Sequence, residues 1–149
     1  MKVLYSTSTN IFKNLALERL LYRQKELKNP ILLFYRNDKS IIIGRNQNPW
    51  KECKIEKIIE SETNLCRRFS GGGAVYQDLG NLCFSFIKPV FDSKAPFDEK
   101  EINNLILAEA FKKLNLNIEA QGRNDLLIKG IFSIILYCNF IKPKIKRES

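Results

Sequence analysis

Two short apolar runs, residues 31–35 and 40–44, constrain the fold of this chain more than any other feature of its sequence. Both runs are rich in apolar and β-branched residues, Ile-Leu-Leu-Phe-Tyr in the first and three isoleucines in the second. Runs of this length and composition are typical of strands. Because only the polar residues 36–39 separate them, we predict a β-hairpin. Because the apolar residues are continuous, we predict a central position in a sheet, covered on both faces.

The rest of the chain alternates between strand-like and helix-like segments. Residues 3–6 and 81–87 are predicted strands, residues 55–59 a short helix, residues 117–120 a strand, and residues 122–128 a turn that runs into another strand. Strands interspersed with helices that pack on them define the α+β class. We therefore predict a mixed, mostly antiparallel sheet with packed helices.

Two longer amphipathic helices are predicted from their caps and their apolar spacing. Asn10 is a good N-cap for the first helix, whose apolar residues are Ile11, Phe12, Leu15, Leu20 and Leu21. Asp98 is predicted to cap the second helix, because an acid follows it three residues later. The apolar residues of this second helix recur at helical spacing and predict a face that lies on the sheet. They are Ile102, Leu105, Ile106, Ala110 and Leu114.

A glycine-rich stretch, residues 67–81, is the strongest functional signal in the chain. It reads Arg-Arg-Phe-Ser-Gly-Gly-Gly-Ala-Val-Tyr-Gln-Asp-Leu-Gly-Asn. Consecutive glycines lack a Cβ, so the backbone can approach a ligand closely. Successive N–H groups in such a loop form an anion-binding nest, and paired arginines add donors for phosphate or carboxylate. On these residues alone, a glycine-rich hairpin loop with two solvated arginines stays open as the alternative.

The whole stretch resembles the lipoate-binding loop of the lipoate–protein ligase and lipoyltransferase family, whose pattern is Arg-Arg-x-Ser-Gly-Gly-Gly-x-Val-Tyr-His-Asp-x-Gly-Asn. This chain carries Gln77 where the family usually has His. Three further segments resemble family motifs in the same order: residues 14–18 (Asn-x-Ala-x-Glu), 44–53 (Gly-Arg-x-Gln-Asn-Pro-Trp-x-Glu-Cys) and 122–125 (Gly-Arg-Asn-Asp). Biotin ligases resemble the chain less, because their phosphate loop has a different arginine-glycine pattern.

The resemblance implies that lipoate or octanoate is activated by ATP as an acyl-adenylate and then joined to a lysine of an acceptor lipoyl domain. Such acceptors are the E2 subunits of 2-oxo acid dehydrogenases and the glycine cleavage H protein. The resemblance also implies that Asn124 and Asp125 position Mg²⁺ and nucleotide phosphates, and that residues 74–76 and 84–86 line an acyl tunnel. The residues implied to bind lipoyl-adenylate are Arg67, Arg68, Ser70, Gly71, Gly72, Gly73, Ala74, Val75, Tyr76 and Asn81.

One family motif is missing from this chain. The family continues into Lys-[Ile/Val/Phe]-Ser-Gly-x-Ala, whose lysine contacts the carboxylate and the phosphate. Alignment of the Phe-Ser pair puts Ile131 at the lysine position, and Lys129 is the nearest cation. Residues 2–130 are interpreted as the N-terminal part of a ligase-like catalytic domain, and residues 131–149 as a divergent, apolar-then-basic tail. We expect a truncated or alternatively spliced product, or a gene model that runs into an intron, with an unpaired sheet edge that lowers solubility.

Three functions stay open from the sequence. They are a full ligase with a replaced lysine, a lipoyltransferase that uses pre-formed lipoyl-adenylate, and a catalytically incompetent fragment that binds lipoyl-adenylate or a partner only. The chain has no histidine and four scattered cysteines, which argues against a zinc site and against Ser-His or Cys-His nucleophiles.

Partners and location follow from composition and motifs. The chain has a net charge of +9, but acidic residues are interspersed among its basic residues, and the sequence contains no recognisable nucleic-acid-binding motif. We therefore expect no nucleic-acid partner. No long apolar run is present and no membrane association is expected. No presequence is visible, and the resemblance implies a mitochondrial location for a eukaryotic protein and a cytoplasmic one for a bacterial protein.

Overall fold

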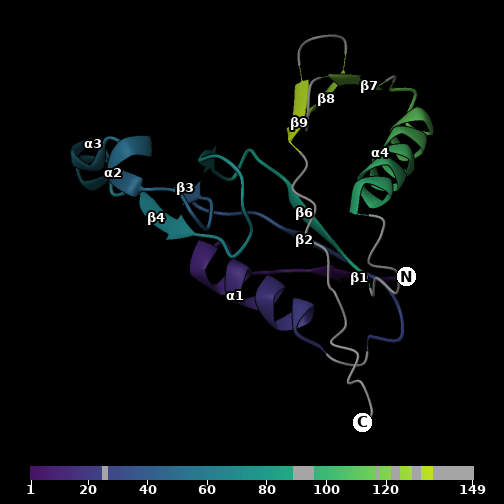
Figure 1. The fold of residues 1–149 in the computed structure, drawn as a ribbon, viewed down its shortest axis with the longest axis horizontal. Coiled ribbons are helices and arrows are strands. Elements are labelled where there is room, and N and C mark those ends of the chain that lie inside the picture. The colour runs from purple at the N-terminus through teal and green to yellow at the C-terminus, as the bar shows by residue number, and fades with distance from the viewer. Residues whose placement is uncertain (25–26, 89–95, 117, 122–124, 129–131, 136–149) are drawn as a thin grey trace.

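The computed structural model describes residues 1–24, 27–88, 96–116, 118–121, 125–128 and 132–135. For residues 96–101 and for those after 116, only the backbone is described. The elements in chain order are β1 (Lys2–Tyr5), α1 (Ile11–Tyr22), β2 (Ile31–Tyr35), β3 (Ser40–Ile43), α2 (Pro49–Glu52), α3 (Ile55–Glu60), β4 (Asn64–Arg67), β5 (Val75–Gln77), β6 (Cys83–Ile87), α4 (Pro96–Lys112), β7 (Ile118–Gln121), β8 (Asp125–Ile128) and β9 (Phe132–Ile135) (Figure 1).

The described strands form three small sheets, in the orders β1-β2-β6, β4-β3-β5 and β7-β8-β9. The pairs β1–β2 and β3–β4 are parallel, and the other four pairs are antiparallel. This confirms the predicted α+β class and the mixed, mostly antiparallel pairing. The strands predicted after residue 116 are β7 and β8, which pair with each other.

The predicted hairpin of residues 31–44 is wrong. β2 and β3 do not pair with each other, because the segment between them carries the chain from the first sheet to the second. Asn37 in this segment is fully buried and hydrogen-bonded through its side chain, whereas a hairpin turn would lie in solvent. The backbone N–H of Asp38 donates to the Thr9 carbonyl at 2.8 Å. The predicted central position is confirmed, since each strand is the middle one of its sheet.

Helix α1 covers one face of the first sheet. Asn10 caps it as predicted, and its side chain accepts a hydrogen bond from the Lys13 N–H. Leu21 packs there in a core cluster with Leu33 and Ile87 of the sheet. Of the apolar residues named for this helix, Ile11 and Leu21 are buried, whereas Phe12 and Leu20 are exposed, and the helix also buries Asn14 and Glu18. The four buried residues lie on one helix face, and two of them are polar.

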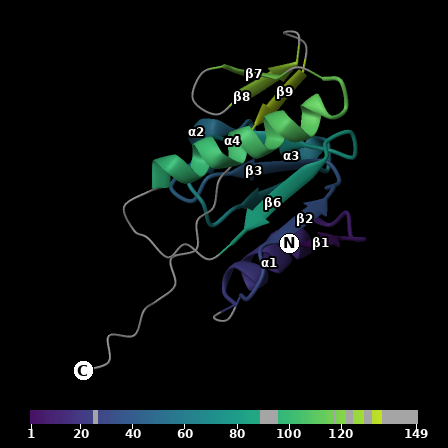
Figure 2. The ribbon, with the colours of Figure 1, turned by 90° about the vertical axis from the view of Figure 1, so that its right-hand side faces the viewer.

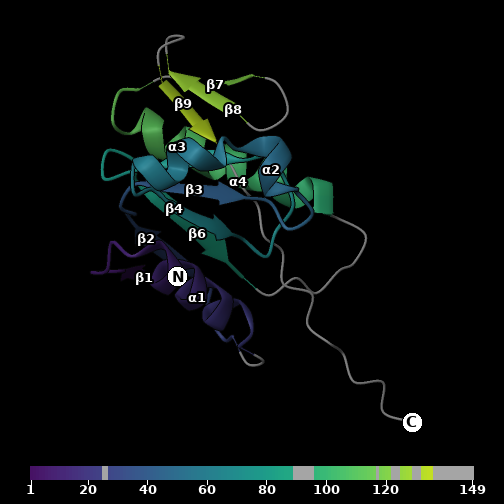
Figure 3. The ribbon, with the colours of Figure 1, turned by 90° about the vertical axis from the view of Figure 1, so that its left-hand side faces the viewer.

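Helix α4 covers the other face of the first sheet. Successive side chains of a strand point to opposite faces, so Phe84 and Phe86 of β6 lie opposite Ile87, and they pack against Leu107 of α4. Figures 2 and 3 show the resulting layers: α1, the β1-β2-β6 sheet, α4, and then the β7-β8-β9 sheet.

Two predictions for α4 are wrong. The helix begins at Pro96, so Asp98 lies inside it and is not its N-cap. The predicted sheet-facing residues are also largely exposed, because the phenylalanine rings of β6 contact the stripe of α4 that contains Leu107. The exposed residues are Ile102, Leu105, Ile106, Ala110 and Leu114.

Candidate functional site

The candidate site is the glycine loop, residues 68–74, which connects β4 to β5. Strands β3 and β4 are parallel, so both of their carboxyl ends reach the same edge of the second sheet. The turn that follows β3, residues 44–48 (the Gly44 turn), therefore lies beside the glycine loop. The Arg45 N–H donates to the Ser70 carbonyl at 2.8 Å, which joins the two segments.

Gly44 is the point of closest approach between the two segments. A Cβ built on Gly44 would lie 2.1 Å from the carbonyl oxygen of Gly72. No side chain fits this space, so glycine is required at position 44 by backbone contact. Gly72 itself has a φ of 99°, a left-handed conformation that glycine adopts without strain.

Arg67 binds the Gly44 turn. One terminal nitrogen of its guanidinium donates to the carbonyls of Gly44, Arg45 and Gln47 at 3.0, 3.0 and 2.7 Å. The side chain of Gln47 in turn accepts from the Gly44 N–H at 2.7 Å. Arg67 as a whole is exposed, and no hydrogen bond joins the other two nitrogens of its guanidinium to a described residue.

Arg68 binds the glycine loop. Only 6% of its surface is exposed. Its Nε donates to the carbonyl of Gly71 at 3.1 Å, and its second terminal nitrogen donates to the carbonyls of Gly71 and Gly73 at 2.9 and 2.7 Å. The first terminal nitrogen donates to the Ile42 carbonyl of β3 at 3.1 Å. The alternative of a solvated arginine does not hold for Arg68, which is buried and ties the loop to the sheet.

The loop keeps several donors without an acceptor. No hydrogen bond joins the N–H groups of Gly71, Gly72 or Gly73 to any described residue. The hydroxyl of Ser70 is buried and has no partner in the described part of the chain. A Cβ built on Gly71 or Gly73 would meet nothing within 4 Å. Unpaired donors beside open space are what an anionic ligand requires.

A buried carboxylate lies beneath Arg68. Glu18 of α1 is 5% exposed, and the hydroxyl of Ser85 donates to it. Burial raises the pKa of Glu18, while the bond from Ser85 and the charge of Arg68 act in the opposite direction. Burial, with the nearby Glu18 charge, also raises the pKa of Tyr35 and raises that of Cys83 to about 12. Cys83 is therefore a protonated thiol at neutral pH. The carboxylate of Glu18 is the buried counter-charge of Arg68.

A chain of side-chain amides supports the other end of β5. The Asn14 amide donates to Asn37 Oδ1 at 2.8 Å, and the Asn37 amide donates to Gln77 Oε1 at 2.7 Å. Ser6 donates to Asn14 Oδ1 at 2.6 Å. Sequence reasoning did not find this role for Asn37. The available signal was the motif asparagine Asn14, which lies three residues after Ile11 and thus on the apolar face of α1.

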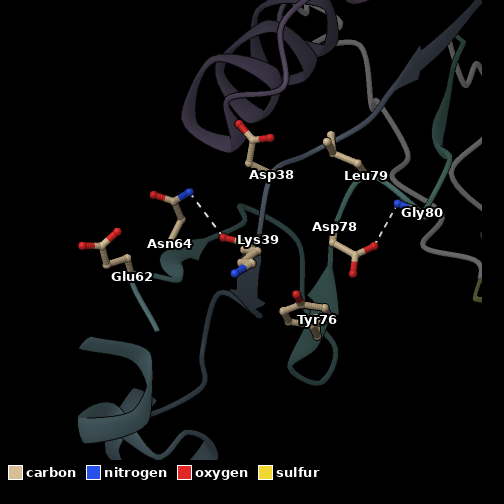
Figure 4. Close-up of a pocket in the computed structure, with 8 residues that line it drawn as sticks. All are labelled: Asp38, Lys39, Glu62, Asn64, Tyr76, Asp78, Leu79 and Gly80. Atoms are coloured by element: carbon tan, nitrogen blue, oxygen red, sulfur yellow. Dashed lines mark hydrogen bonds between the residues drawn. The ribbon is translucent and has the colours of Figure 1, made fainter. Parts of the chain in front are cut away.

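Other predicted residues lie away from the open side of the loop. Asn81 closes the turn after β5, where its Oδ1 accepts from the Asp78 N–H at 2.9 Å. A cavity of about 700 Å³ lies at the opposite end of the second sheet (Figure 4). Its lining residues are Asp38, Lys39, Glu62, Asn64, Tyr76, Asp78, Leu79 and Gly80. Of the predicted ligand residues, Tyr76 faces this cavity rather than the glycine loop, and Val75 and Ala74 connect the two ends.

The predicted magnesium and lysine positions lie outside the described side chains. They are Asn124, Asp125 and Lys129. In the part of the chain whose side chains are described, no group of three Cys, Asp or Glu residues is arranged to hold a metal ion. None of the described helices combines the length and the apolar character that a membrane span requires.

The profile of the lipoyl protein ligase A/B catalytic domain matches residues 10–136, which is most of the sequence. The chain belongs to the lipoyl protein ligase A/B family. It is also similar to solved structures of family members. P. falciparum LipL1 in complex with lipoate is 39% identical, with a TM-score of 0.72 over 85% of this chain and 40% of that one.

Two further family structures are described with ATP or with a lipoyl domain. A lipoate–protein ligase A bound with ATP is 30% identical, with a TM-score of 0.80 over 89% of this chain and 58% of that one. A bi-partite lipoate protein ligase from Thermoplasma acidophilum, described with its E2 lipoyl domain, is 31% identical, with a TM-score of 0.76 over 85% of this chain and 50% of that one. This lipoyl ligase family chain thus spans about half the length of the structures it matches.

Proposed function

We propose that this chain binds lipoyl-adenylate on the glycine loop and takes part in protein lipoylation as a lipoate–protein ligase or lipoyltransferase. The observation that carries the proposal is the row of unpaired donors on the loop: the Ser70 hydroxyl and the N–H groups of Gly71, Gly72 and Gly73. These donors face no acceptor in the described part of the chain, and a family member of similar fold holds lipoate.

Two steps make up the proposed chemistry. A carboxylate oxygen of lipoate attacks the α-phosphorus of ATP, a new oxygen–phosphorus bond forms, and pyrophosphate leaves. The amine of an acceptor lysine then attacks the acyl carbon, AMP leaves, and the amine proton passes to solvent. Both steps develop negative charge on oxygens, and preorganised N–H donors stabilise such charge. The loop donors and the accessible part of the Arg67 guanidinium supply this stabilisation.

The acceptor lysine belongs to a lipoyl domain in this proposal. The Thermoplasma ligase described with its E2 lipoyl domain supports that class of acceptor, and the glycine cleavage H protein is proposed as a second acceptor on the resemblance alone. ATP use is supported by the ATP-bound relative. Asn124 and Asp125 are proposed to position Mg²⁺ with the nucleotide phosphates. A mitochondrial or cytoplasmic location stays a prediction.

Activation and transfer place different demands on this chain. In the family a lysine contacts the carboxylate being activated, and position 131 here is isoleucine. Transfer from a pre-formed adenylate needs only the anion-binding donors and an oriented acyl group. The second candidate, a chain that binds lipoyl-adenylate without turnover, rests on the same missing lysine.

A gel-shift lipoylation assay with an apo lipoyl domain tests the proposal. One arm supplies lipoate and ATP–Mg²⁺, and the other supplies pre-formed lipoyl-adenylate. Transfer in both arms identifies a complete ligase, and Lys129→Ala then tests the replacement lysine. Transfer only from the adenylate identifies a lipoyltransferase. Calorimetry with a non-hydrolysable lipoyl-adenylate analogue decides between binding without turnover and the absence of any lipoyl site, which would refute the proposal.

A further inference from the structure

We propose that Arg68 is the positioning residue of the glycine loop: its buried guanidinium turns two peptide planes so that the N–H groups of Gly72 and Ala74 point outward. In this role the arginine acts on an anionic ligand through the backbone, by setting the direction of the donors. The inference rests on the proposed function for the identity of the ligand, and on the geometry of Arg68 alone for the arrangement of the loop.

The direction of the donors follows from the carbonyls that Arg68 holds. In a trans peptide the C=O of one residue and the N–H of the next point in opposite directions, and the described peptide bonds are all trans. Arg68 binds the carbonyls of Gly71 and Gly73 at 2.9 and 2.7 Å. The N–H groups of Gly72 and Ala74 therefore point away from the guanidinium. Arg68 is buried and Gly72 and Ala74 are exposed, so that direction leads outward.

Gly72 makes this arrangement possible. It lies between the two held peptides, with a φ of 99°. Its own carbonyl lies against Gly44, so the carbonyls on either side of it can both turn to Arg68. The loop thereby presents the N–H groups of Gly72 and Ala74 on one side, where both can donate to one anionic ligand.

A planar fork is needed to hold both peptides. Nε and one terminal nitrogen bind Gly71 and Gly73, while the other terminal nitrogen is fixed to the Ile42 carbonyl of β3. Lysine has a single ammonium on a flexible stem and cannot reproduce three fixed directions. The nearby carboxylate of Glu18 offsets the buried charge of Arg68.

The alternative is that Arg68 acts only by touching the ligand. The two roles differ in the ligand-free protein, because a positioning residue orders the loop before any ligand binds. NMR order parameters of the Gly72 and Ala74 amides report this directly: about 0.85 in a rigid backbone and below about 0.6 in a flexible one.

The test compares the wild-type chain with Arg68→Lys and Arg68→Gln, and with Arg19→Gln as an exposed control for lost charge. We expect both Arg68 variants to lower the order parameters of Gly72 and Ala74 while β2 stays rigid. Affinity for the non-hydrolysable lipoyl-adenylate analogue should fall about 100-fold, as for the loss of a hydrogen bond to a charged group. Arg19→Gln should change neither quantity.

Several outcomes would overturn the inference. An ordered loop with weakened binding would make Arg68 a direct ligand contact, and a disordered loop with unchanged binding would remove the nest from ligand recognition. If the wild-type chain does not bind the analogue, the proposed function fails while the order parameters still decide the role of Arg68. If the variants do not fold, scalar couplings across the hydrogen bonds from Arg68 to Gly71 and Gly73 in the wild-type chain decide it: their absence overturns the inference.

Discussion

Adding one methyl group at Gly44 tests whether backbone contact between the Gly44 turn and the glycine loop shapes the site. In Gly44→Ala the new Cβ would lie 2.1 Å from the Gly72 oxygen, whereas real Cβ atoms essentially never come closer than 3.0 Å. The loop must therefore move by about 1 Å. Overpacking of this kind costs about 1–3 kcal/mol of stability, and a displacement of about 1 Å in a binding group costs about 100-fold in its effect on a reaction.

The assay has two parts, chemical denaturation and calorimetry with the lipoyl-adenylate analogue. We expect Gly44→Ala to lose about 1–3 kcal/mol in the free energy of unfolding and to bind the analogue about 100-fold more weakly. Gly80→Ala is the matched control, because its Cβ meets no backbone atom but only Asp78 Oδ1, at 3.1 Å; it can cost the hydrogen bond that this oxygen accepts from the Gly80 N–H but leaves the glycine loop in place. Wild-type stability and affinity in Gly44→Ala would refute the reasoning that the two backbones touch.

Three further predictions concern the support of the site. Asn14→Ala should cost about 2–4 kcal/mol in urea denaturation, because it leaves buried partners such as Asn37 unsatisfied; a loss no larger than the roughly 1 kcal/mol of a cap such as Asn10→Ala would contradict it. Glu62→Gly should stabilise by about 0.5–1 kcal/mol: the left-handed φ of 51° at Glu62 costs a non-glycine residue about 1–2 kcal/mol, and the greater entropy loss of glycine offsets about 0.5–1 kcal/mol of this. An unchanged melting temperature would argue against strain there. Burial raises the pKa of Glu18 above 4.5, so its contribution to stability falls as pH rises from about 4.5 through the raised pKa; Glu18→Gln should lose this pH dependence, and identical stability–pH curves would count against it.

Local patterns in the sequence predicted the elements better than their pairing. The Asn10 cap and the strand character of the two apolar runs depend on neighbouring residues, and both are confirmed. The pairing of β2 with β6 joins Leu33 to Ser85, and no local pattern contains such a contact. The short polar linker between the two runs predicted a hairpin. That prediction failed because the linker is buried through Asn37, whose hydrogen-bond partners lie in α1 and β5, far away in the sequence.

The site was predicted in composition but not in geometry. The run of glycines did indicate a loop of close backbone approach, and Gly44 and Gly72 meet there. The two arginines were predicted to face an anion, which stays a prediction, and no pattern could show that Arg68 also binds Gly71 and Gly73. Adjacent residues at the end of a strand point in opposite directions. Arg67 and Arg68 therefore lie in different environments, although their side chains are identical.

The separation of β2 and β3 into different sheets has a consequence for folding. Each is a central strand, yet β3 meets β5 only once residues 75–77 are present, and β2 meets β6 only once residues 83–87 are present. Non-local pairings of this kind slow folding, because the entropy cost of closing a long loop comes before any stabilising contact has formed. During synthesis β2 therefore has only β1 to pair with, and β3 only β4, until residues 75–87 are added. Both sheets are completed only after the glycine loop has been made, so the site and the core form together.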